Sequence, residues 1–96
     1  MVDDLMDRSR VSAAIDGVTF TRDPASCADA DVVIIDVARH GGAISAARSA
    51  APSARIVAFG PHVDDATLAQ AGVDGADAVL ARSVFFRDPD AAVTAK

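Results

Sequence analysis

The sequence places carboxylates and one arginine where buried strands are expected to end. Asp36 follows the run VVII at positions 32–35, and four consecutive large aliphatic residues are typical of a strand buried on both faces. Asp3 and Asp4 lie near the start of the chain, and Arg82 follows another apolar stretch. Open parallel sheets bind ligands at the carboxyl ends of their strands, so we expect these side chains to meet at one edge.

Three carboxylates at one edge repel one another unless a cation lies between them. Hard oxygen ligands select Mg²⁺, which tolerates few protein ligands and retains several waters. Asp3, Asp4 and Asp36 are therefore candidate magnesium ligands. A metal-bound aspartate beside a cation such as Arg82 can also attack a phosphoryl group, because the charge on the transferring oxygens is then neutralised from both sides.

Each of these residues also has a simpler structural explanation. Asp36 can cap the segment after its strand, and Asp3 and Asp4 can interact with the dipole of the following helix. Arg82 can neutralise Asp36 or Asp3 as an ion pair, without metal. His62 is expected at the rim of the site and not as a metal ligand, because no second His or Cys stands at metal-binding spacing.

Strand and helix patterns alternate along the chain, which predicts an α/β fold with a parallel sheet joined by right-handed crossovers. Strands are expected at 18–21, 31–37, 55–59 and 77–81, with 31–37 in the middle of the sheet. Helices are expected at about 5–15, 24–28, 43–51 and 65–71 and near the C-terminus. Gly72 is expected to end the helix at 65–71, and Ser83 or Asp88 is expected to cap the C-terminal helix.

Length and composition limit the fold to one domain over residues 1–96, and the hydrophobic share of 51% is sufficient for one core. The net charge of −5 and the scattered positions of nine Lys and Arg residues argue against direct nucleic-acid binding. No apolar run has the length of a membrane span and the start lacks a signal-peptide pattern, so no membrane association and a cytoplasmic location are expected.

Several segments occur in a characteristic order: VDD near the start, the apolar strand that ends in Asp36, a loop with glycines, ARIVAFGPHVDD and GADAVLAR. This ordered set resembles the receiver domain of two-component response regulators, over nearly the whole chain except its first strand. The resemblance implies a flavodoxin-like (CheY-like) doubly wound parallel sheet with strand order 2-1-3-4-5. Only Met1 and Val2 remain to form the first strand, so we expect it to be minimal, truncated, or completed by another chain.

By this resemblance, Asp3 and Asp4 match the acidic pair that binds Mg²⁺, and Asp36 matches the phosphoacceptor. Gly60 stands where the family carries a Thr or Ser hydroxyl, and Arg82 stands where it carries a Lys. The hydroxyl couples phosphorylation to a change of surface, and glycine has no side chain that could do so. Arg82 keeps the charge but is bulkier and forked.

The segments DLMDRSRV, FGPHVD and LARSVFF also resemble short, stand-alone receiver-like proteins with degenerate switch positions, or pseudo-receivers. The resemblance implies a signalling domain that acts by regulated protein–protein interaction with a histidine kinase or another signalling protein. Such a domain is not an enzyme beyond its own phosphorylation at Asp36.

Phe85 and Phe86 follow the last expected strand, in the region where partner proteins bind members of this family. With His62 they are candidates for an interaction surface, including a homodimer face, whereas core packing of both rings is the simpler interpretation. Two other functions stay open: a binding or dimerisation module independent of phosphorylation, and a small ligand-binding flavodoxin-like domain. The latter would need a phosphate-binding or similar ligand loop that the sequence lacks.

Overall fold

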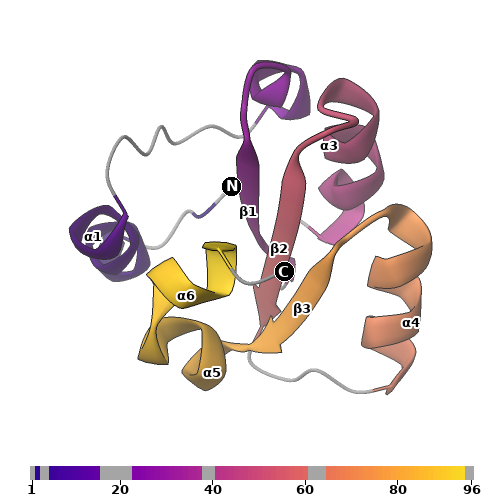
Figure 1. Ribbon diagram of the computed structural model, residues 1–96. Helices are drawn as coiled ribbons and strands as arrows, with labels where there is room; N and C mark the ends of the chain where they lie inside the picture. The colour runs from indigo at the N-terminus through magenta and orange to yellow at the C-terminus, as the bar shows by residue number, and fades with distance from the viewer. Residues whose placement is uncertain (1, 3–4, 16–22, 38–40, 61–64, 95–96) are drawn as a thin grey trace.

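The computed structural model describes residues 2, 5–15, 23–37, 41–60 and 65–94 (Figure 1). Its described sheet contains three parallel strands in the order β1-β2-β3. They are β1 (Val32–Asp36), β2 (Arg55–Gly60) and β3 (Ala78–Ala81), each within one residue of the range expected from the sequence. The strand expected at 18–21 lies outside the described residues.

Helices cover both faces of this sheet (Figure 1). The short helices η1 (Pro24–Cys27) and η2 (Gly41–Ala43), with α3 (Ile44–Ala50) and α4 (Asp65–Asp74), belong to one side. The helices α1 (Leu5–Ala14), α5 (Arg82–Arg87) and α6 (Pro89–Thr94) belong to the other. The alternation of strand and helix in the sequence therefore gives the layered α/β arrangement that it predicted.

Alternate strand residues divide the core into two clusters, one on each face of the sheet. The α3-side core contains Cys27, Val33, Ile35, Ile44, Ala47, Ala51, Ala54, Ile56, Ala58 and Ala71. The α5-side core contains Val2, Val11, Val57, Phe59, Phe85 and Val93. Val2 lies in this second core without forming a strand, so no strand precedes α1 among the residues that the structure describes.

The middle position in the described sheet belongs to β2, whereas the sequence placed the 31–37 strand there. Five of the six residues of β2 are buried. In β1, Val32 and Ile34 are only half-buried, so that strand is fully covered on one face and not on both. On this face α5 and α6 pack against β2, and Val32 and Ile34 pack against the α5-side core as partly buried residues.

Two helix ends differ from the expected ones. Gly72 does not stop α4, whose last residue is Asp74. The next residue, Gly75, has a positive φ of 109°, which suits a residue without Cβ. The amides of Gly75 and Ala76 both donate to the carbonyl of Ala71, at 3.1 and 2.9 Å. The C-terminal helix is divided into α5 and α6, because Asp88 caps α6 through the amide of Ala91 and Pro89 starts it.

Candidate functional site at the carboxyl edge of the sheet

Asp36 is the last residue of β1 and lies at the carboxyl edge, as the sequence predicted. It is 5% exposed, which is unusual for a carboxylate. Val32 and Ile34 contribute to the α5-side core, so strand alternation places Asp36 on that same face, in register with Phe59 of β2. The fold therefore positions this carboxylate where open α/β sheets bind ligands.

Gly60 ends β2 and is buried at the same edge, paired in register with Ala81. Its position agrees with the sequence analysis, and it supplies no hydroxyl to the site. Arg82 follows Ala81 directly and is the first residue of α5. Asp36, Gly60 and Arg82 thus occupy the ends of three adjacent strands.

Arg82 forms a bidentate ion pair with Asp7 of α1. Its Nη1 donates to Asp7 Oδ2 at 2.5 Å, and its Nη2 donates to Asp7 Oδ1. The Asp7 side chain is 2% exposed and the Arg82 side chain 37%. A buried carboxylate requires charged or hydrogen-bonding partners, and the Arg82 guanidinium supplies a bidentate one for Asp7.

The sequence does not identify Asp7 as the partner of Arg82, and it offers Asp36 or Asp3 instead. One signal was available, because Asp7 stands four positions before Val11 and shares its helix face. Val11 is buried in the α5-side core, so an acidic residue on this face must also be buried. Periodicity could show that Asp7 points inward, but it could not name a partner 75 positions away.

Three phenylalanines form a compact group beneath the Arg82 guanidinium. The Phe59 and Phe85 rings stack with centroids 4.7 Å apart, and Phe86 meets each of them edge to face, at 5.1 and 4.9 Å. The guanidinium carbon of Arg82 lies 5.1 Å from the Phe86 centroid, and that of Arg10 lies 5.5 Å from it. These cation–π contacts hold the α1 and α5 side chains in a common arrangement.

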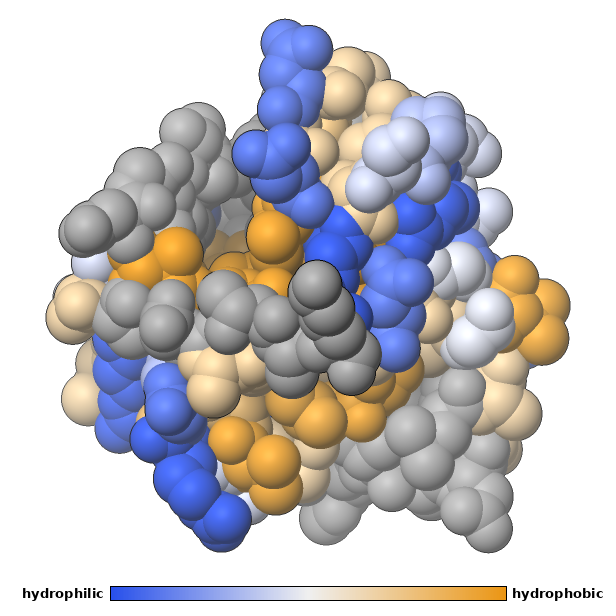
Figure 2. Space-filling view, in the orientation of Figure 1, coloured by the Kyte–Doolittle hydropathy of each residue, from blue (hydrophilic) through white to orange (hydrophobic). Residues whose placement is uncertain are grey.

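The two adjacent aromatics of α5 therefore have different environments. Phe85 is fully buried, so it belongs to the core and not to the surface proposed from the sequence. Phe86 is half-buried between two arginines, and Val84, two positions earlier in α5, is 44% exposed. Figure 2 shows hydrophobic and strongly hydrophilic residues next to each other on this face of the molecule, over α5 and α6.

The remaining site residues expected from the sequence, Asp3, Asp4 and His62, lie outside the described residues. Within the described ranges no group of three or more His, Cys, Asp or Glu residues could hold a metal ion. Asp36 offers the oxygen donor that Mg²⁺ prefers, but it is one of the three expected carboxylates. The magnesium site thus remains a prediction.

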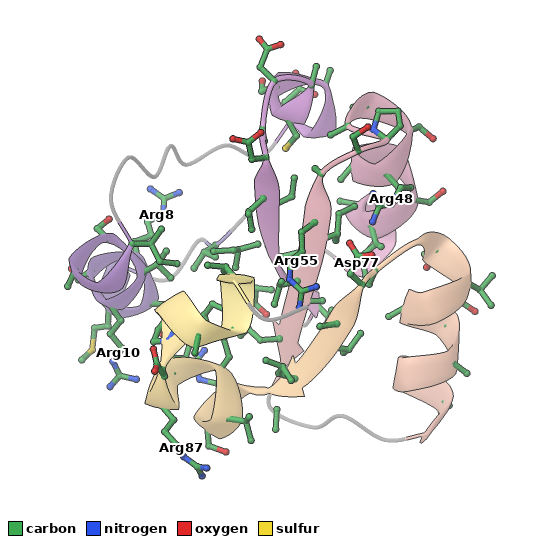
Figure 3. All side chains as sticks on the ribbon, in the orientation of Figure 1. Arg8, Arg10, Arg48, Arg55, Asp77 and Arg87 are labelled. Atoms are coloured by element: carbon green, nitrogen blue, oxygen red, sulfur yellow. The ribbon has the colours of Figure 1, made fainter. Side chains whose placement is uncertain are left out.

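A second arginine–aspartate pair lies at the opposite, amino edge of the sheet (Figure 3). Arg48 of α3 contacts Asp77 Oδ2 at 2.7 Å and also donates to the carbonyls of Gly75 and Ala54. Asp77 accepts a further hydrogen bond from the amide of Ile56, which is the main reason that its pKa is lowered, with Arg48 adding to the effect. This network joins α3, β2 and the start of β3, far from Asp36.

Comparison with known proteins supports the fold. A crystal structure of a response regulator protein from Burkholderia pseudomallei, with a phosphorylated aspartic acid, calcium ion and citrate, superimposes with a TM-score of 0.73 at 20% identity. The fold is receiver-like. The match covers 94% of this chain and 61% of that one, so the chain spans about three fifths of the length of the protein it resembles.

Searches by sequence add no relative. No family model matches the chain, and no curated protein matches it. In the part of the chain that the structure describes, no helix is long and apolar enough to cross a bilayer.

Proposed function

We propose that this chain is a receiver-like signalling domain that acts by protein–protein interaction, with Asp36 as its phosphoacceptor. The observation that carries the proposal is the buried carboxylate of Asp36 at the carboxyl end of β1, in a fold similar to that of a response regulator with a phosphorylated aspartic acid. The partner would be a histidine kinase or another signalling protein.

The chemistry would be phosphoryl transfer to the side chain of Asp36. An Asp36 carboxylate oxygen forms a bond to the phosphorus of the donor, and the bond from phosphorus to the donor's leaving oxygen breaks. With acetyl phosphate as donor, acetate leaves with the electron pair. Mg²⁺, held by Asp36 with Asp3 and Asp4, would supply positive charge to the phosphoryl oxygens.

The test is the intact mass of the folded protein after incubation with Mg²⁺ and acetyl phosphate. We expect a single added phosphoryl group in the wild-type chain and none in Asp36→Asn, which preserves side-chain size without a nucleophilic carboxylate. An Asp29→Asn variant is the matched control, since Asp29 is exposed and lies outside the site. Absence of the adduct in wild-type protein, or its persistence in Asp36→Asn, would contradict the assignment of Asp36.

A second candidate function is a pseudo-receiver, which binds its partner without phosphorylation. Two observations favour it: Gly60 has no hydroxyl at the carboxyl edge, and Arg82 is bound to Asp7. This candidate predicts that Asp36→Asn leaves affinity for a co-purifying partner unchanged. A tenfold or greater loss of that affinity, measured by calorimetry, would argue against it and for a role of the Asp36 charge.

A further inference from the structure

The Asp7–Arg82 pair lies on the face of the sheet that carries Asp36. Asp36 is in register with Phe59, and the guanidinium carbon of Arg82 lies 5.9 Å from the centroid of the Phe59 ring. Neighbouring strands are about 4.8 Å apart, so the ring beneath Arg82 adjoins the strand that ends in Asp36. One guanidinium therefore has two carboxylates on its side of the sheet: Asp7 is in contact with it, and Asp36 ends β1, on the far side of the Phe59 strand.

Several contacts favour pairing of the Arg82 guanidinium with Asp7 over pairing with Asp36. The pair is bidentate, which fixes the orientation of the guanidinium as well as its position. Asp7 is almost completely buried, so it cannot exchange Arg82 for water. The same guanidinium also lies over the rings of Phe59 and Phe86, which adds two contacts to the Asp7-bound position.

We propose that Asp7 is a positioning residue that holds Arg82 toward α1 and thereby slows phosphoryl transfer to Asp36. The inference rests on the proposed function and deepens it. While the bond from Asp36 to phosphorus forms and the bond to the leaving acetate breaks, negative charge is spread over the three equatorial phosphoryl oxygens. While Arg82 is bound to Asp7, its Nη1 and Nη2 donate to that carboxylate. Releasing them would make these donors and their charge available to the phosphoryl oxygens.

The first test measures the rate of adduct formation with Mg²⁺ and acetyl phosphate in three proteins. Asp7→Asn removes the charge that retains Arg82, and we expect its rate to rise about tenfold or more over wild type, as one well-placed charge does in other active sites. In the double variant Asp7→Asn/Arg82→Ala the gain should disappear. Asp77→Asn, which removes the acid of the other arginine–aspartate pair, should react at the wild-type rate.

An unchanged or lower rate in Asp7→Asn, or a gain that survives in the double variant, would overturn the proposal. If Asp7→Asn does not fold, Arg82→Lys replaces it, because one ammonium group cannot form the bidentate pair and the buried carboxylate keeps a cation. The rate of this variant should also rise, and a rate at or below that of wild type would count against the proposal.

A second measurement does not require phosphorylation. In ¹⁵N-labelled protein without Mg²⁺, the Nε–Hε NMR signal of Arg82 reports which carboxylate the guanidinium contacts. We expect Asp36→Asn to shift this signal more strongly in the Asp7→Asn background than in the wild-type background. Equal shifts in the two backgrounds would show that Asp7 does not control the position of Arg82. If no variant forms an adduct with acetyl phosphate, the proposed phosphotransfer is rejected. The NMR measurement then still decides whether Asp7 holds Arg82.

Discussion

Arg82 and Asp7 differ in how well water could replace a lost partner. The Asp7 side chain is 2% exposed, so removal of Arg82 leaves a buried charge without its bidentate partner. The Arg82 side chain is 37% exposed, so removal of Asp7 leaves a guanidinium that solvent can reach. The two halves of one ion pair should therefore have unequal effects on stability.

We predict that Arg82→Ala lowers the free energy of unfolding by about 3 kcal/mol, and that Asp7→Ala lowers it by about 1–2 kcal/mol. Urea denaturation of the two variants measures the difference directly. Arg87→Ala is the control, because Arg87 is an exposed residue of the same helix, and its effect should lie within about 0.5 kcal/mol of zero. A larger loss in Asp7→Ala than in Arg82→Ala would contradict the asymmetry.

At the scale of an element, the end of α4 depends on a glycine whose place the sequence did not predict. Gly72 and Gly75 are three residues apart, and a stop signal read from sequence alone cannot distinguish them. The structure does so through backbone conformation and space. Gly75 has a φ of +109° and a Cβ there would lie 2.8 Å from Arg48 Cγ, whereas a Cβ on Gly72 would meet nothing within 4 Å.

Alanine substitution at these two glycines should have opposite effects. We predict that Gly75→Ala destabilises the protein by about 1–3 kcal/mol, since it combines backbone strain with displacement of the Arg48 side chain. Gly72→Ala, inside the helix, should stabilise it by about 0.5–1 kcal/mol. Thermal unfolding of both variants provides the comparison, and a destabilised Gly72→Ala would show that this position is constrained by something other than helix propensity.

At the scale of the whole molecule, the Arg48–Asp77 network connects several elements at the amino edge of the sheet. It joins α3, β2, the residue after α4 and the residue before β3 through one guanidinium and one carboxylate. The hydrogen bonds from Arg48 to backbone carbonyls do not depend on the charge of Asp77, whereas its ion pair with Asp77 requires that carboxylate to be ionised. The lowered pKa of Asp77 in the folded protein means that the folded state favours the charged form more than the unfolded state does.

Stability should therefore depend on pH through Asp77 on the acid side. The contribution is fully present above the unfolded pKa, near the ordinary value of 3.8, and is lost as the pH falls through the lower folded pKa. We predict that the difference in unfolding free energy between wild type and Asp77→Asn is constant between roughly pH 5 and 7 and shrinks below about pH 4. A difference that grows on acidification would contradict this sign.

Much of the architecture follows from local patterns in the chain. Residues 32–36, 55–60 and 78–81 form strands because runs of aliphatic residues between turn signals have few other stable arrangements in a small α/β domain. Asp36, Gly60 and Arg82 then reach the carboxyl edge, since parallel strands end there together. Local patterns thus predicted the edge at which the candidate site lies.

The sequence by itself determined the three described strands, the layering and the edge that carries Asp36, but not which strand lies in the middle of the described sheet. Only the tertiary structure decided which charges pair, because Asp7 and Arg82 are 75 positions apart and Arg48 and Asp77 are 29 apart. A run of apolar residues specifies its own burial through periodicity, which needs only neighbours in the chain. The partner of a buried charge is set by the packing of distant elements, and here that packing places Arg82 against Asp7.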